Sequence, residues 1–150
     1  MAYWPPRQEG DLVWSRLSKR DQAVPKRFTA VYPISGENLN ALPVRDISPA
    51  VDFYRTALGF EVLSQDDTQA VVGRDDVRLG LVRKSDHRPG EAGSCCFAVT
   101  DLKAVRDELL ARGGSEVGVL GTDEWGGKCY RTFFVREAEN GYCYCFCTPA

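Results

Sequence analysis

One order of secondary structure occurs twice along this chain, and this internal repeat sets the strongest limit on its fold. Each copy predicts a strand, then a helix, then three further short strands. The first copy spans about residues 39–83 and the second about residues 94–148. The copies share little sequence identity, so the repeat rests on the order of the elements. The sequence therefore predicts an α+β domain built from two β-α-β-β-β modules.

The helix of the first copy has recognisable ends. Ser48 is a suitable N-cap residue, Pro49 suits the first helical position, and Gly59 ends the helix. Apolar residues recur on one face between these ends, as expected for a helix that covers a sheet. The strands of this copy are predicted at residues 39–44, 60–63, 70–73 and 77–82.

The second copy repeats this pattern. Thr100 or Asp101 caps its helix, and Gly113 ends it. The dipeptide Asn140-Gly141 is a strong signal for a hairpin turn between the last two strands. The strands of this copy are predicted at residues 94–99, 116–120, 128–136 and 142–147.

Residues 1–38 differ in composition from the rest and are predicted to form an arm that precedes a single domain over residues 39–150. Prolines punctuate the arm, and its basic residues outnumber its acidic ones. Residues 28–34 can form an edge strand, a position in which Pro33 is tolerated. A short amphipathic turn is predicted earlier in the arm, at Leu12, Val13, Trp14 and Leu17.

Composition and charge exclude several classes of function. The formal net charge of −2 and the pI near 5.5 give no basic field for nucleic acid or anionic lipid. No apolar run approaches the roughly 18 residues of a membrane span, and the first residues do not resemble a signal peptide. Apart from Cys129, the six cysteines are adjacent in sequence or alternate along one strand, and such cysteines pair poorly. We therefore expect a cytoplasmic protein whose cysteines are small, buried, hydrophobic residues.

Several motifs together resemble a known superfamily. Ala-Leu-Pro-Val-Arg-Asp-Ile at 41–47 precedes Ala-Val-Asp-Phe-Tyr-Arg-Thr-Ala-Leu-Gly-Phe-Glu-Val at 50–62. Further motifs follow at residues 97–102, 108–113, 124–127 and 132–137, before Asn140-Gly141. In this order they resemble the glyoxalase, bleomycin-resistance and extradiol-dioxygenase superfamily, also called the vicinal oxygen chelate superfamily. The resemblance covers about residues 39–148 and is greatest to the metal-free binding proteins of the bleomycin-resistance type.

The resemblance implies that the strands of the two modules form a curled mixed sheet around a cavity, with the helices outside. It also implies a homodimer. Because side chains alternate along a strand, the strand at 94–99 has two faces. We expect the apolar side chains of Phe97 and Val99 to face the helix. Ser94 and Cys96, on the opposite face, are then expected to line the cavity.

The resemblance also permits a test for a metal. Enzymes of this superfamily hold a divalent cation with His and Glu side chains on the inner faces of the strands. The corresponding positions here are Leu39, Ser94 and Tyr144, and a one-residue slip of the last strand offers only Cys143 or Cys145. A hard divalent cation needs several oxygen or nitrogen ligands, which these residues do not supply. We therefore expect no metal, no other cofactor and no catalytic residue.

The last strand carries two apolar sets. Cys143, Cys145 and Cys147 are expected to pack beneath the helices, whereas the aromatic residues that alternate with them are expected to line the cavity and stack on planar ligands. Trp125 is expected to form either a movable lid or a plug at the dimer interface. The predicted ligand-binding residues are Ser94, Cys96, Trp125, Arg131, Tyr142, Tyr144 and Phe146, of which Arg131 depends on an unsettled strand face.

Three hypotheses for function follow. The first is a metal-free protein that binds a small hydrophobic or aromatic molecule, with antibiotic sequestration as the analogy from the superfamily. The second is a divalent-metal-dependent lyase or dioxygenase with ligands from Glu37, Glu61, His87 or Glu139, although His87 is expected to be a solvated loop residue. The third is a structural or regulatory protein in which the arm completes a dimer.

Overall fold

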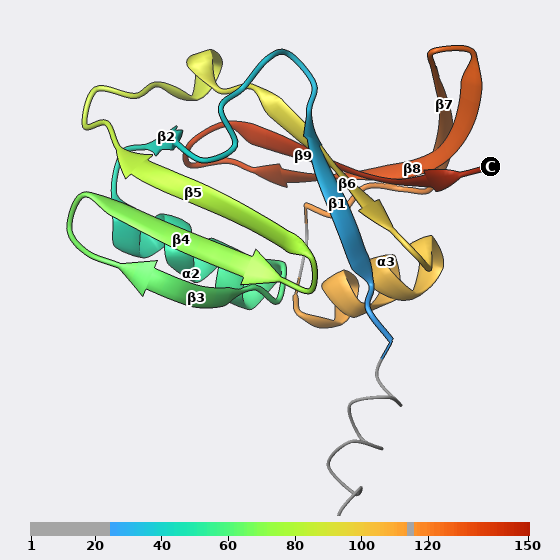
Figure 1. The fold of residues 1–150 in the computed structure, drawn as a ribbon, viewed down its shortest axis with the longest axis horizontal. Coiled ribbons are helices and arrows are strands. Elements are labelled where there is room, and N and C mark those ends of the chain that lie inside the picture. Colours follow the sequence, from blue (N-terminus) through green and yellow to red (C-terminus); the bar gives the residue numbers. More distant parts are fainter. Residues whose placement is uncertain (1–24, 114–115) are drawn as a thin grey trace, which may run out of the picture.

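The computed structural model describes residues 25–113 and 116–150. Two helices and two sheets surround one hydrophobic core, to which both sheets contribute (Figure 1). In the part of the chain that the structure describes, no helix is both long and apolar enough to span a membrane.

The first module forms a four-stranded sheet in the order β2-β5-β4-β3. Strand β2 runs parallel to β5, and the other neighbours are antiparallel. Helix α2 connects β2 to β3, and its apolar face packs on β3, β4 and β5. The elements are β2 (Leu42–Val44), α2 (Ile47–Ala57), β3 (Glu61–Gln65), β4 (Gln69–Arg74) and β5 (Val77–Arg83).

The second module repeats this topology in the order β6-β9-β8-β7, with β6 parallel to β9. Helix α3 packs on β8 and β9, and a short 3-10 helix, η1 (Pro89–Glu91), precedes the module. The elements are β6 (Ser94–Val99), α3 (Leu102–Ala111), β7 (Gly121–Trp125), β8 (Lys128–Glu137) and β9 (Tyr142–Pro149). The predicted α+β fold of two β-α-β-β-β modules is confirmed, and each module forms its own sheet.

Strand β1 (Phe28–Pro33) pairs antiparallel with β6 and gives its sheet a fifth strand, at the edge predicted from the sequence. Phe28 is fully buried, and the backbone N–H groups of Arg27 and Phe28 donate to the Asp75 carboxylate. Strand β1 therefore ties the two modules together. The amphipathic turn predicted in the arm lies outside the described residues.

Two element boundaries differ from the prediction. Helix α2 begins at Ile47 with Asp46 as N-cap, so Ser48 and Pro49 lie in its first turn. Proline is tolerated there because the first N–H groups of a helix have no intrahelical partner. At the other helix, Asp101 is the cap, and its side chain accepts a hydrogen bond from the Ala104 N–H.

The strand predicted at residues 116–120 is reduced to one bridge between Val117 and Val135, and the edge strand of the sheet is β7 instead. Gly126 and Gly127, both with positive φ, connect β7 to β8 as a two-residue turn. Such a turn matches the twist of the paired strands, and it fixes their register. The resulting hairpin extends beyond the rest of the domain (Figure 1).

Candidate functional site

The β1-β6-β9-β8-β7 sheet has one face in the core and one face that the described helices leave open. The core face carries Cys95, Phe97 and Val99 of β6, which pack with the residues of α3. The opposite face carries Cys96 and Ala98, which belong to a separate apolar cluster. The predicted orientation of β6 is therefore confirmed by its packing.

The orientation predicted for β9 is wrong. Parallel pairing places Tyr144 beside Cys95 and Phe146 beside Phe97, so the aromatic set of β9 faces the core. Tyr142, Tyr144 and Phe146 are at most 2% exposed, and all three belong to the core cluster. Their large side chains fill the volume beneath the helices, which the smaller cysteines could not fill.

The three cysteines of β9 point the other way. Cys145 and Cys147 form the open-face cluster with Cys96, against which Ala98 and Tyr130 pack. Cys95 lies on the core face and does not join them. The prediction that the β9 cysteines pack beneath the helices is thus corrected, and thiols form part of the open face instead.

A pocket of about 280 Å³ lies on this open face. It extends from β1 and the following loop, across β6 and β9, to the β7–β8 hairpin. Its walls are mostly apolar, and the rings of Trp125 and Tyr130 meet with centroids 5.2 Å apart. The lining residues are Tyr32, Pro33, Ile34, Cys96, Trp125, Tyr130 and Cys147.

The hairpin determines which side chains of β7 and β8 reach this pocket. Register pairs Trp125 with Lys128 and Asp123 with Tyr130, so these residues share the open face. Trp125 is the last residue of β7, next to a tight turn, and it forms part of the pocket wall. Strand β7 was not predicted, because Gly126-Gly127 is equally typical of a flexible loop.

Arg131 and Ser94, two further predicted site residues, lie outside the pocket lining. Arg131 follows Tyr130 in β8, so it points to the other face and is exposed at the end of the sheet. The strand face that the sequence left open for Arg131 is therefore the one away from the pocket. Ser94 shares the open face with Cys96 but is half-buried beside Cys143, beyond the pocket.

Asp123 places a carboxylate on the same face of the sheet as this group of residues. One of its oxygens accepts a hydrogen bond of 2.7 Å from the buried Thr132 hydroxyl. Asp123 stands directly opposite Tyr130 in the hairpin, so this bond holds the Asp123 side chain on the open face beside Tyr130. Asp123 was not singled out as a site residue from the sequence, since acids are common at turns.

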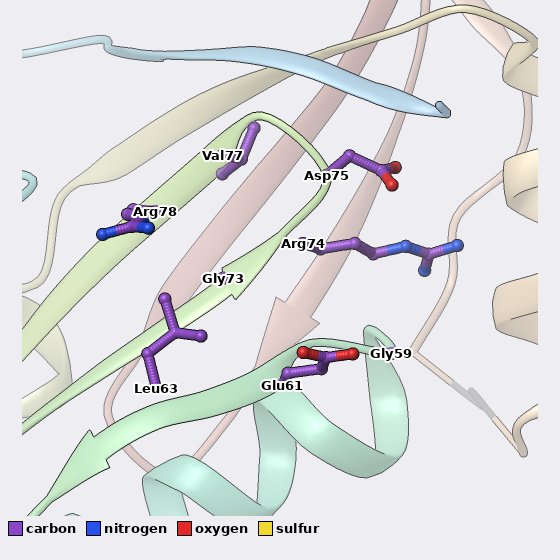
Figure 2. A pocket seen from close by; sticks show the side chains of 8 residues that line it. All are labelled: Gly59, Glu61, Leu63, Gly73, Arg74, Asp75, Val77 and Arg78. Carbon is purple, nitrogen blue, oxygen red and sulfur yellow. The ribbon is translucent and has the colours of Figure 1, made fainter. Parts of the chain in front are cut away.

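A second pocket, of about 320 Å³, lies at the end of the other sheet and is mainly polar (Figure 2). Two of its charged residues, Arg74 and Asp75, are already engaged in the fold. Arg74 forms a 2.7 Å ion pair with Glu108 and donates to the Leu58 carbonyl, and Asp75 holds the start of β1. In Figure 2 the Arg74 and Asp75 side chains extend past the end of β4, away from Leu63 and Arg78. We therefore take the apolar pocket as the candidate site.

A family model described as "Glyoxalase/Bleomycin resistance protein/Dioxygenase superfamily" matches residues 38–142, which cover the first module and the second module up to the start of β9. The chain belongs to this superfamily. The two repeated β-α-β-β-β modules and the helix-covered sheets agree with that assignment.

Solved structures of this superfamily share the fold. A bleomycin-binding protein in complex with bleomycin is 20% identical with a TM-score of 0.65, over 77% of this chain and all of that one. A bleomycin resistance determinant encoded on the transposon Tn5 is also 20% identical, with a TM-score of 0.60 over 77% of this chain and 98% of that one. The bleomycin-binding protein of Streptomyces verticillus, complexed with copper(II)-bleomycin, is 26% identical with a TM-score of 0.57, over 75% and 94%.

The residues at the metal-ligand positions of the superfamily do not fit a divalent cation. Leu39 packs against the core, and the Tyr144 hydroxyl is hydrogen-bonded to that of Tyr54 inside the core. The residue of β9 that stands beside Ser94 is Cys143, which the one-residue slip had offered. None of these side chains is a carboxylate or an imidazole, so the superfamily's metal chemistry has no ligand set at these positions.

Glu37, one of the alternative metal ligands, is held by the backbone. It accepts hydrogen bonds from the N–H groups of Ile34, Ser35 and Ser94. Burial acts to raise its pKa, but these hydrogen bonds outweigh burial, and the pKa of Glu37 lies below the usual value. Its carboxylate therefore fixes the loop after β1, which forms one wall of the apolar pocket.

His87, the second alternative ligand, is only 1% exposed, so the expected solvated position is wrong. Its ring stacks on Tyr142, and its Nε2 atom lies 2.9 Å from the Asn140 carbonyl oxygen, to which it donates. Glu61 and Glu139 are both exposed, on separate elements. Among residues 25–113 and 116–150, no three His, Cys, Asp or Glu side chains are grouped so that they could hold a metal ion.

Proposed function

We propose that this protein binds a small hydrophobic or aromatic molecule in the pocket on the open face of the β1-β6-β9-β8-β7 sheet, without a metal. The observation that carries the proposal is the mainly apolar 280 Å³ pocket with Trp125 and Tyr130 in its wall. Its volume falls near the lower end of ordinary ligand pockets, about 300–1,000 Å³. Aromatic side chains stack on planar ligands, and apolar burial supplies roughly 25 cal/mol per Å².

Sequestration of an antibiotic is the specific form of this proposal that the relatives support. Two solved relatives hold bleomycin or copper(II)-bleomycin, and these share the fold of this chain at 20–26% identity. In such a role the protein lowers the free concentration of the molecule and needs no catalytic residue. The free thiols of all six cysteines agree with a reducing compartment, and we propose a cytoplasmic location.

We further propose that the chain forms a homodimer through the open face. Tyr32, Ile34, Trp125 and Phe134 are 38–56% exposed on that face, which is unusual for a group of large apolar side chains. A second copy that covers them would also deepen the pocket. Light scattering after size exclusion should give twice the monomer mass, and a monomer mass at micromolar concentration would contradict the dimer.

Thermal-shift measurements test the binding proposal directly. The full-length protein is screened against bleomycin and a panel of planar aromatic compounds, with aliphatic compounds of equal size as controls. A ligand that binds only the native state raises the Tm in a concentration-dependent manner. We expect at least one planar compound to do so. If every compound leaves the Tm unchanged at millimolar concentration, the proposal is wrong.

A further inference from the structure

Two thiols meet at the floor of the apolar pocket. Cys96 of β6 and Cys147 of β9 are diagonal neighbours on parallel strands, since Cys96 pairs in register with Cys145 and Cys147 pairs with Ala98. Their Sγ atoms are 3.0 Å apart. A disulfide has an S–S distance of about 2.05 Å and Cα atoms usually about 4.4–6.8 Å apart, whereas diagonal neighbours on adjacent strands lie about 7–8 Å apart. Bond formation therefore needs a local shift of β6 against β9 in addition to the approach of the two sulfurs.

The pocket gives this pair of thiols a shared opening to small molecules, whereas Cys143 and Cys129 are more exposed but lie outside the pocket lining. Cys96 and Cys147 both line the pocket and are each 7% exposed. Cys145 is fully buried behind them, and Cys95 is on the core face of the same strand. Cys129 is exposed in the β7–β8 hairpin, with no described sulfur within hydrogen-bonding distance.

We propose that Cys96 and Cys147 are a modification site, at which a peroxide that enters the pocket oxidises the two thiols to an intrachain disulfide. One sulfur, as its thiolate, attacks a peroxide oxygen, the O–O bond breaks, and the released hydroxide takes up a proton to become water. The resulting sulfenic acid is attacked by the second sulfur, so the S–S bond forms and the S–O bond breaks. The second thiol's proton leaves with the hydroxyl group as water, and one peroxide is consumed for each disulfide.

The surroundings of the two thiols set the conditions for this reaction. The neighbouring Cys145 thiol, together with burial, raises the pKa of Cys96 to about 12. The hydrogen bond with Cys96 and burial raise the pKa of Cys147 further. Because the thiolate is the reactive form and the pKa of both thiols is raised, oxidation is slow at neutral pH and faster in alkaline solution.

The disulfide changes the pocket itself. It joins β6 to β9 at the floor and removes both S–H groups from the lining. The oxidation state of the pair therefore alters the surface offered to any molecule that the pocket holds. The reaction needs only the pocket and the peroxide, so it can be tested without a known ligand, and its outcome is separate from that of the binding proposal.

The test is thiol counting on the full-length protein. Reduced protein is treated with hydrogen peroxide at pH 7.5 and pH 9, the remaining thiols are alkylated, and the intact mass and the linked peptides are measured. We expect the number of alkylated cysteines to fall from six to four, faster at pH 9, with fragmentation that links Cys96 to Cys147. Retention of all six thiols, or a link between other cysteines, overturns the proposal.

Matched serine variants provide the controls. Cys96→Ser and Cys147→Ser should each abolish the loss of two thiols, whereas Cys129→Ser and Cys145→Ser should retain it. Circular dichroism verifies that each variant is folded. A loss of two thiols that persists in Cys96→Ser contradicts the assignment. Oxidation that is confined to Cys129 as intermolecular disulfides also contradicts it, and nonreducing electrophoresis reveals such dimers.

Discussion

The hydroxyl groups of Tyr54 on α2 and Tyr144 on β9 are hydrogen-bonded to each other inside the core, where both side chains are at most 2% exposed. Neither hydroxyl has another hydrogen-bond partner among the described residues. This bond connects the helix of the first module to the last strand of the second. Tyr144 stands at a metal-ligand position of the superfamily, and here its hydroxyl makes a structural contact instead.

Removal of both of these hydroxyls should cost less stability than the sum of the two single removals. Tyr54→Phe or Tyr144→Phe leaves the other buried hydroxyl without a partner, and we expect each to lower the free energy of unfolding by about 1–3 kcal/mol. The double variant removes both polar groups and should be less destabilised than the sum of the two single variants. Urea denaturation of the four proteins gives the coupling energy. Additive effects would show that the two hydroxyls do not interact.

Alkaline pH should destabilise the protein. Burial raises the pKa of Tyr54, Tyr142 and Tyr144 above the ordinary value near 10, and burial raises that of Cys95 to about 12. The unfolded chain therefore releases these protons at a lower pH than the native state does. As pH rises above the unfolded pKa values, about 8.5 for Cys and 10 for Tyr, the native state binds more protons and stability falls.

The expected slope is up to about 1.4 kcal/mol per pH unit for each group that titrates only in the unfolded state. Urea denaturation at pH 8, 9, 10 and 11 measures this slope. Tyr142→Phe removes one of the buried hydroxyls and should make the decline above pH 10 less steep. A free energy of unfolding that stays constant from pH 8 to 11 would contradict the argument.

The elements of the fold other than β7 could be predicted because their signals are local. The period of apolar residues separates helix from strand, and the caps and glycines mark the ends. The orientation of β9 could not be predicted in the same way, since both of its faces are apolar. Only the volume needed beneath α3 determines that Phe146 faces the core and Cys147 faces the pocket.

Only part of the candidate site could be predicted, because some of its residues are brought together by long-range pairing. Cys96 and Trp125 line the pocket as expected from β6 alternation and from the position before Gly126-Gly127. Tyr32 and Tyr130 were not predicted as lining residues, because their positions depend on the long-range pairing of β1 with β6 and on the register of the hairpin. Contacts between segments distant in sequence leave no local signal.

His87 should be important for stability rather than for binding. Its ring is buried against Tyr142, and its Nε2–H donates to the Asn140 carbonyl, which joins the loop before η1 to the β8–β9 turn. His87→Ala removes both interactions and leaves a cavity, so we expect a loss of about 2–4 kcal/mol. Arg88→Ala, at the exposed neighbouring position, is the control and should change stability by less than about 0.5 kcal/mol. Equal stabilities of the two variants in urea would contradict this role.

Trp125 should contribute to ligand affinity without contributing much to stability. Its side chain is 40% exposed at the end of β7, and its ring contacts Tyr130 in the pocket wall. For a planar compound found by the thermal-shift screen, Trp125→Ala should weaken binding by about 1–3 kcal/mol, or roughly 5- to 150-fold in Kd, through lost stacking and apolar contact. Phe134→Ala is the matched control, because Phe134 is 38% exposed on the same face but outside the pocket lining. Calorimetric titration of both variants separates the two positions. Unchanged affinity in Trp125→Ala, or equal losses in both variants, would place the ligand elsewhere on the open face.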